Sequence, residues 1–222
     1  MTPRAPTRAA IVGALHGVVE WLPVSSSGHV ALLIDAARWP EAVPARRRER
    51  RALEVALHTG SLVPLGRRVA ADLRAAPAPG ALIAAGVAAT AITSVIGAAA
   101  GDAVESRFAG PRSVAAGLAA GSVGLLLAER RAEQAASVSG GRTGRPLTGL
   151  STADVVAVGV AQGLAIWPGV SRRAATLAAA RARGLDPDAA SVLSWATGFP
   201  TLVAATGWQF WRARDELRAN PA

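Results

Sequence analysis

Long stretches without a charged side chain dominate this 222-residue chain. Residues 75–101 hold 27 consecutive uncharged positions, residues 189–211 hold 23, and residues 113–128 hold 16. None of these stretches has the polar stripe that a helix on the surface of a soluble protein shows. A helix of about 20 apolar residues spans the ~30 Å hydrocarbon core of a bilayer. The first two stretches therefore predict membrane-spanning helices, and the third is marginal in length.

Two further apolar stretches are interrupted. Residues 9–34 contain one charge, Glu20, and then Pro23 with a run of small polar residues. Residues 155–171 are also uncharged and contain the pair Pro168-Gly169. Because proline stops a helix and serine caps the one that follows, each stretch predicts two short helices joined by an irregular loop. At membrane depth, such a loop is tolerated only when it is buried in protein or lines a watery cavity.

The two interrupted stretches resemble each other at an offset of 146 residues. The matched positions are Gly13 with Gly159, Gly17 with Gly163, Trp21 with Trp167, Val24 with Val170, and Ser25 with Ser171. Paired broken helices in two halves of a chain are typical of membrane proteins built from inverted repeats, although chance similarity in an Ala- and Gly-rich chain is the alternative. The predicted fold is an all-α polytopic membrane protein with two inverted-topology repeats. Each repeat has a broken re-entrant helix pair and transmembrane helices.

The domain boundaries follow from this pattern. Residues 1–222 form a single integral membrane domain on this interpretation. Its predicted parts are a first repeat over residues 7–100, an intervening transmembrane helix over 113–128, an exposed linker over 129–151, and a second repeat over 152–222. The linker is predicted from its Ser-Gly-Gly sequence and its charges.

The net charge of +9 points toward anionic partners, but its placement decides which ones. Arginine clusters at residues 46–51, 67–68 and 130–131 flank the apolar stretches, as expected of loops that touch lipid headgroups. Arg173 is predicted to reach the membrane interface in the same way. A soluble nucleic-acid-binding protein would need basic residues interleaved with aromatic ones, and the chain has only 6 Trp and 3 Phe. A soluble all-α core is the other alternative, but only 18% of the residues are charged, below the usual quarter.

Three ionisable residues near the first break are candidates for chemistry. Glu20 lies where a carboxylate is costly unless it is paired or hydrated, which makes a functional role the default. His16 precedes it by four residues and shares its helix face, so the two could hold a divalent cation or position a water. A structural hydrogen bond between them is the alternative. His29 is a candidate general acid or base, with a capping or packing role as the alternative.

Serine residues and an arginine supply what an anion needs. Ser25, Ser26 and Ser27 stand at a predicted helix start, where backbone amides can cradle an anion. Arg172 follows the second break and offers a planar fork suited to phosphate oxygens. Ser171 and Thr176 would add hydroxyl donors. If the two breaks meet, these groups suit a phosphate ester or anhydride that is presented from a lipid.

The same residues carry a family resemblance. Residues 20–29, EWLPVSSSGH, resemble the EFLPVSSTGH motif of the undecaprenyl-diphosphatases, the bacitracin-resistance family. Residues 168–176, PGVSRRAAT, are similar to its second motif, PGxSRSGxT. Residues 53–68 and 191–200 also look family-like, so the resemblance covers most of the chain.

The resemblance implies an enzyme of the cytoplasmic membrane with several spans. It would remove the terminal phosphate of undecaprenyl diphosphate with a divalent cation, Mg²⁺ or Ca²⁺, and regenerate the monophosphate carrier of cell-wall synthesis. Glu20 would be the second acid of the family's E/Q-x-x-x-E motif, while Ser26 and His29 would be catalytic. Arg172 would clamp the diphosphate, with Ser171 and Thr176 assisting. The nucleophile, water or a serine hydroxyl, is left open, as is assembly into a homo-oligomer.

Three departures from the family pattern qualify these expectations. His16 stands at the first position of the E/Q-x-x-x-E motif, and Mg²⁺ and Ca²⁺ prefer oxygen ligands. Arg173-Ala174 replaces the Ser-Gly of the second motif. The chain also ends about one helix after Pro200, as expected of a shortened member. A transporter or flippase of a lipid phosphate, without hydrolysis, is therefore the main alternative function.

Overall fold

The chain is almost entirely helical. A computed structural model describes residues 4–40, 47–108, 110–138 and 144–219. Its helices are α1 (Ala5–Val19), α2 (Ser26–Ala36), α3 (Arg47–Ala75), α4 (Pro79–Phe108), α5 (Pro111–Val138), the 3₁₀ helix η3 (Leu147–Gly149), α6 (Thr152–Leu164), α7 (Arg172–Ala182) and α8 (Pro187–Ala219). The only β-type pairing in these ranges is an isolated bridge between Arg145 and Leu185. The predicted all-α class is confirmed.

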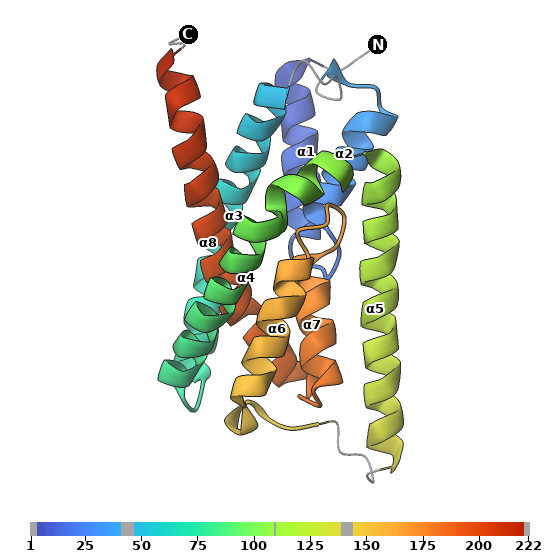
Figure 1. The fold of residues 1–222 in the computed structure, drawn as a ribbon, viewed down its shortest axis with the longest axis vertical. Coiled ribbons are helices and arrows are strands. Elements are labelled where there is room, and N and C mark those ends of the chain that lie inside the picture. The colour runs from blue at the N-terminus through green and yellow to red at the C-terminus, as the bar shows by residue number, and fades with distance from the viewer. Residues whose placement is uncertain (1–3, 41–46, 109, 139–143, 220–222) are drawn as a thin grey trace.

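Both predicted breaks are present, and they meet. The α1–α2 pair is interrupted at residues 20–25, and the α6–α7 pair at residues 165–171. In Figure 1 the α1–α2 pair lies in the upper half of the molecule and the α6–α7 pair in the lower half, with the two connecting loops near the middle. The contact is close, because a Cβ added to Gly28 would lie 3.2 Å from the Cα of Gly169.

The two breaks are built alike. The Ser25 side chain caps α2 by accepting a hydrogen bond from the Gly28 amide at 3.2 Å, and Ser171 caps α7 through the Ala174 amide at the same distance. These caps satisfy amides that would otherwise have no partner at a helix start. Gly169 has φ +88, and a Cβ there would also meet the carbonyl oxygen of Val114. Only glycine fits this turn, which brings the second break against α5.

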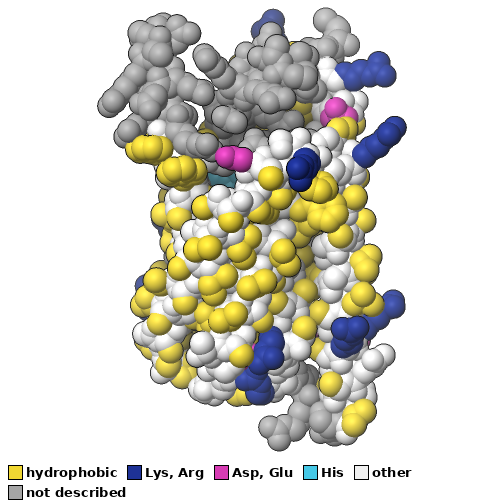
Figure 2. All heavy atoms as spheres, viewed as in Figure 1, with side chains coloured by type: hydrophobic (Ala, Val, Ile, Leu, Met, Phe, Trp, Pro, Cys, Tyr) yellow, Lys and Arg dark blue, Asp and Glu magenta, His cyan; other side chains and the backbone are white. Residues whose placement is uncertain are grey.

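Two helices, α4 and α5, are long and apolar enough to cross a membrane within the described part of the chain. Helix α8 contains the uncharged stretch 189–211 but does not meet the same criterion. On the face seen in Figure 2, hydrophobic side chains cover the middle of the molecule, and arginines lie toward its two ends. Exposed apolar side chains on α4, such as Val87 and Val95, fit contact with lipid. Arg46 of the first arginine cluster lies outside the described residues.

Helix α5 is longer than the stretch that predicted it. It continues beyond residue 128 to Val138, because the alanine, glutamate and arginine residues that follow favour helix. The first part of the predicted linker is therefore helical, and its Ser-Gly-Gly sequence, residues 139–141, lies outside the described residues. The segment then continues with η3 before α6 begins.

A buried carboxylate anchors the start of α6. Asp154 is fully buried and accepts hydrogen bonds from the Ser151 amide and hydroxyl at 2.9 and 2.8 Å. It also pairs with Arg145 at 3.0 Å and with Arg183 at 2.9 Å. Burial alone would raise the pKa of this carboxyl, but the hydrogen bonds from Ser151, Arg183 and Arg145 together lower it to about 2. The cluster ties the segment before α6 to the end of α7.

Asp154→Asn is expected to destabilise the protein by about 1–3 kcal/mol, because it leaves two arginines without their charge partner. The apparent unfolding temperature in detergent, measured by intrinsic fluorescence, should fall clearly. Asp72→Asn, which breaks the Arg68 pair on the surface of α3, is the matched control and should cost about 0–1 kcal/mol. Since the folded-state pKa of Asp154 lies below the unfolded value, its contribution is complete at neutral pH and declines as pH falls from about 4 toward 2. Equal losses in the two variants would contradict this role.

Candidate active site

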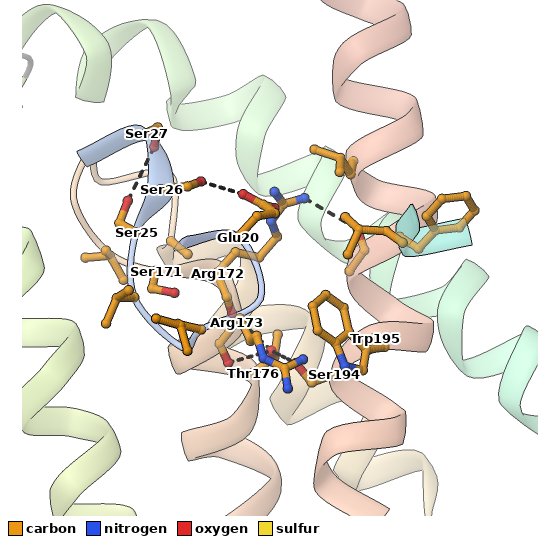
Figure 3. A pocket seen from close by; sticks show the side chains of 18 of the residues that line it. Glu20, Ser25, Ser26, Ser27, Ser171, Arg172, Arg173, Thr176, Ser194 and Trp195 are labelled. Atoms are coloured by element: carbon orange, nitrogen blue, oxygen red, sulfur yellow. Dashed lines mark hydrogen bonds between the residues drawn. The ribbon is translucent and has the colours of Figure 1, made fainter. Parts of the chain in front are cut away.

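A polar cavity lies where the two breaks meet. It has a volume of about 120 Å³, enough for several waters or a small anionic headgroup. Its walls come from both breaks, from the starts of α2 and α7, and from the middle of α3 and α8 (Figure 3). The predicted site residues in its wall are Glu20, Ser25, Ser26, Ser27, Ser171, Arg172 and Thr176. The tertiary structure therefore brings together most of the residues that the two motifs supplied.

Glu20 and Ser26 face each other across the first break. The Ser26 hydroxyl donates a hydrogen bond to Oε2 of Glu20 at 2.5 Å (Figure 3). Glu20 follows the last turn of α1, and Ser26 opens α2. This places a nucleophilic hydroxyl and a candidate base within hydrogen-bond reach, the arrangement that activates a serine.

Arg172 supplies the positive charge opposite this pair. Its guanidinium lies beside Glu20 in Figure 3 and donates a hydrogen bond to the Gly198 carbonyl of α8 at 3.4 Å. The N-termini of α2 and α7 also meet at the cavity, and each contributes amide groups and the positive end of a helix dipole. The cavity therefore combines three features that attract a phosphate: the guanidinium of Arg172, the N-terminus of α2 and the N-terminus of α7.

Several predicted anion ligands have structural partners as well. Ser25 and Ser171 act as helix caps, and the Ser27 hydroxyl lies 3.3 Å from that of Ser25. The Thr176 hydroxyl bonds the carbonyl of Arg172 and the hydroxyl of Ser194, the latter at 2.7 Å. These contacts shape the two helix starts. Their roles toward a substrate stay predictions.

His29 is held away from the cavity. Its ring Nδ1 lies 2.7 Å from the carbonyl oxygen of Ser25, to which it donates within the first turns of α2. It is not among the described residues that line the cavity. The contact matches the capping alternative considered for this residue, and a role as general acid or base stays a prediction.

The structure adds residues that the motifs did not supply. His58 on α3 lines the cavity, and its ring contacts that of His16 edge-on at a centroid distance of 5.1 Å. Gly198 on α8 accepts the bond from Arg172. The sequence contained one weak indication of these residues. At an offset of 138 residues, Thr59-Gly60 matches Thr197-Gly198, and both pairs adjoin residues of the cavity wall. Nothing in that match indicated which neighbours would point inward.

His16 and Gln162, which are matched at an offset of 146 residues, make different contacts. Gln162 donates hydrogen bonds to Thr93 of α4 at 3.0 Å and to Thr201 of α8 at 2.8 Å, so it joins three helices. His16 is only 2% exposed, and its Nδ1 lies 3.3 Å from the Ser61 hydroxyl. Its Nε2 is buried without a hydrogen-bond partner and lies 3.7 Å from Oε2 of Glu20.

The side chains beside Glu20 offer few of the oxygen ligands that the Mg²⁺ or Ca²⁺ ion implied by the resemblance takes. No group of three or more His, Cys, Asp or Glu side chains able to hold a metal occurs in the described part of the chain. The pair that is present has one carboxylate and one imidazole, whereas these hard cations take several oxygen ligands. The carboxylate oxygen nearest His16 also accepts the bond from Ser26.

His16→Glu is expected to create a two-carboxylate site and to raise the affinity for Mg²⁺ or Ca²⁺ by about tenfold or more. The two buried acids repel each other without a cation, so bound Mg²⁺ should also raise the unfolding temperature of this variant more than that of the original chain. Calorimetric titration and thermal shift would measure both effects. His16→Gln, which removes the imidazole without adding a charge, is the control. Unchanged Mg²⁺ affinity in His16→Glu would show that the imidazole does not limit cation binding.

The fold and the cavity together define the class of protein. The chain is a helical protein whose described part has two helices of membrane-spanning length and an internal site that combines a carboxylate, a serine and an arginine. Such a site suits phosphate chemistry on a lipid-linked molecule.

Comparison with known proteins identifies the family. The model of the bacitracin resistance protein BacA family matches residues 9–221, so the chain belongs to this family. It is 33% identical to an undecaprenyl-diphosphatase of Thermus thermophilus, over 94% of this chain and 76% of that protein. A protein of the same name from Nitratidesulfovibrio vulgaris (strain DP4) is 31% identical over 90% of this chain and 74% of its own. The corresponding protein of Dechloromonas aromatica is 27% identical over 99% and 78%.

Proposed function

We propose that this chain hydrolyses undecaprenyl diphosphate, or a related polyprenyl diphosphate, to the lipid monophosphate and inorganic phosphate. Family membership and the name of its relatives support the reaction. The observation that carries the proposal is the placement of Arg172 and the Glu20–Ser26 pair around one cavity between two helix N-termini.

Ser26 is the nucleophile in this proposal, and Glu20 is its base. The Ser26 oxygen attacks the terminal phosphorus, and its proton passes to Glu20. The bond from that phosphorus to the bridging oxygen breaks, and the lipid monophosphate leaves with the electron pair. After Glu20 has released its proton to solvent, it accepts one from a water that attacks the phosphoserine. The bond from phosphorus to the Ser26 oxygen then breaks, Glu20 returns the proton to that oxygen, and inorganic phosphate departs.

Arg172 and the amides at the two helix starts offset the negative charge of the transferring phosphoryl group. These donors are held in place by caps and by the Gly198 carbonyl before substrate arrives. Fixed donors of this kind lower the barrier because they need little reorganisation during the reaction.

The proposed setting is the cytoplasmic membrane, which the chain crosses several times. Helices α4 and α5 have the length and composition of spans. The α1–α2 and α6–α7 pairs act as re-entrant pairs that enter from opposite faces, as two inverted repeats would. The similar caps of the two breaks and their approach in the middle of the molecule support this arrangement.

Phosphate release from a C55 or shorter isoprenyl diphosphate by the purified protein tests the proposal. The assay should be run in detergent and in liposomes, with varied divalent cations and with a chelator. Glu20→Gln serves as the inactive control. Release that depends on Glu20 supports hydrolysis. Binding and transbilayer movement of the lipid without release would instead establish the transporter alternative.

A further inference from the structure

Arg173 does not reach the membrane interface as its sequence position predicted. Its guanidinium carbon lies 3.7 Å from the centroid of the Trp195 ring, and its Nη2 donates to the Ser191 hydroxyl at 3.4 Å. Figure 3 shows Arg173 and Trp195 together at the cavity, with Arg172 directed toward Glu20 instead. The cavity is therefore lined by two arginines that point to different parts of it.

The Arg173–Trp195 pair carries an excess of donors. Nε and Nη1 of Arg173 and Nε1 of Trp195 are buried without a hydrogen-bond partner, and they make up three of the five such atoms in the described residues. Neither side chain has an acceptor of its own, so the two cannot satisfy each other. Buried donors without partners are costly and rare in native proteins, which indicates that an acceptor binds here.

The acid on α3 that acts on Arg173 does not meet this need. Asp72 acts on Arg173 electrostatically, but its carboxylate is engaged by Arg68 on the same helix, at 3.0 and 2.9 Å. The Trp195 ring offsets part of the charge of Arg173 without accepting a hydrogen bond from it. A ligand rich in oxygen acceptors and negatively charged satisfies both the donors and the charge, as a phosphate group does.

We propose that Arg173 and Trp195 form a second phosphate subsite, which holds the lipid-linked phosphate while Arg172 holds the terminal one. Trp195 packs in an apolar cluster with Leu65, Val69 and Leu202, so a lipid chain attached to this phosphate would meet apolar side chains. The subsite favours a diphosphate over a monophosphate, because only a diphosphate reaches both arginines. This assignment rests on the proposed lipid diphosphate substrate.

The test measures binding of farnesyl methylenediphosphonate, which cannot be hydrolysed at its bridge, to the full chain in detergent. Arg173→Ser is expected to weaken binding by about 10- to 100-fold and to reduce the preference for the diphosphonate over farnesyl monophosphate. Trp195→Phe, which keeps the ring and loses the donor, should weaken it by about three- to tenfold. Arg131→Ser on the exposed surface of α5 removes the same charge and should leave binding unchanged.

Thermal stability separates this role from a structural one. Without ligand, Arg173→Ser should unfold at the same temperature as the original chain or higher, because it removes buried donors that lack partners. A lower unfolding temperature with unchanged diphosphonate affinity would overturn the subsite. The subsite would also be overturned if Arg173→Ser weakened binding of inorganic phosphate and left that of the diphosphonate unchanged.

The outcomes also separate the subsite from the proposed reaction. Phosphate release by the original chain with the same diphosphonate affinity in Arg173→Ser would retain the reaction and reject the subsite. Arg173-dependent diphosphonate binding without any phosphate release would retain the subsite and reject hydrolysis.

Discussion

Arg172→Ala is expected to lower kcat/KM for phosphate release by a factor of about 10³ to 10⁵, comparable to removal of an arginine that stabilises a phosphoryl-transfer transition state. The loss should be large because the guanidinium is already held beside Glu20 and by the Gly198 carbonyl. Arg172→Lys keeps the charge but loses the planar fork, so its activity should be intermediate. Steady-state phosphate release with an isoprenyl diphosphate measures both variants.

The control for Arg172 is an arginine that is remote from the cavity. Arg131→Ala changes the net charge equally on an exposed surface of α5, and its kcat/KM should stay within about twofold, since surface substitutions of this kind change little. Unfolding temperatures verify that each variant is folded. Arg172→Ala with more than about a tenth of the original activity would exclude a central role in phosphoryl transfer.

Ser26→Ala is expected to reduce kcat by about 10⁴-fold or more, because it removes the proposed nucleophile. Glu20→Gln keeps the shape of the acid but cannot accept the serine proton, and a loss of about 10² to 10⁴ is expected. The double variant should be little worse than Ser26→Ala alone, since the two residues act as a unit. Rapid-quench experiments followed by mass spectrometry should detect phosphate on Ser26 during turnover.

Ser25→Ala is the matched control for Ser26. It removes the cap of α2 and should cost about 1 kcal/mol of stability with a much smaller effect on kcat than Ser26→Ala. If Ser26→Ala keeps activity within about tenfold of the original chain and no phosphoserine forms, water is the nucleophile. Glu20 would then act as the base for that water.

The two breaks could be predicted from the sequence because their causes are local. Pro23 and Pro168 disfavour a continued helix, and Ser25 and Ser171 cap the helix that follows each break. Proline alone does not set a break, because Pro64 and Pro200 lie inside α3 and α8. The length of α5 was not predictable in the same way. The uncharged stretch ends at residue 128, whereas the helix continues through charged residues to Val138. Charge ends an apolar stretch without ending a helix.

The site was predictable only in part. The motifs identified Glu20, Ser26 and Arg172, and the structure places all three at one cavity. His29 belongs to the same motif, yet its ring bonds the backbone of its own helix and does not line the cavity. A motif gives residue types and spacing, but the direction of each side chain depends on the rotation of its helix against the neighbouring ones.

The sequence by itself determined the helical class, the positions of the breaks and the arginine clusters beside the apolar stretches, because hydropathy, proline and capping act over a few residues. Only the tertiary structure decided which polar groups share a cavity. It directs Arg173 onto Trp195, which lies 22 residues away on another helix, and sets His58 of α3 beside His16 of α1. Such contacts depend on how helices pack across the whole chain, and no local pattern encodes them.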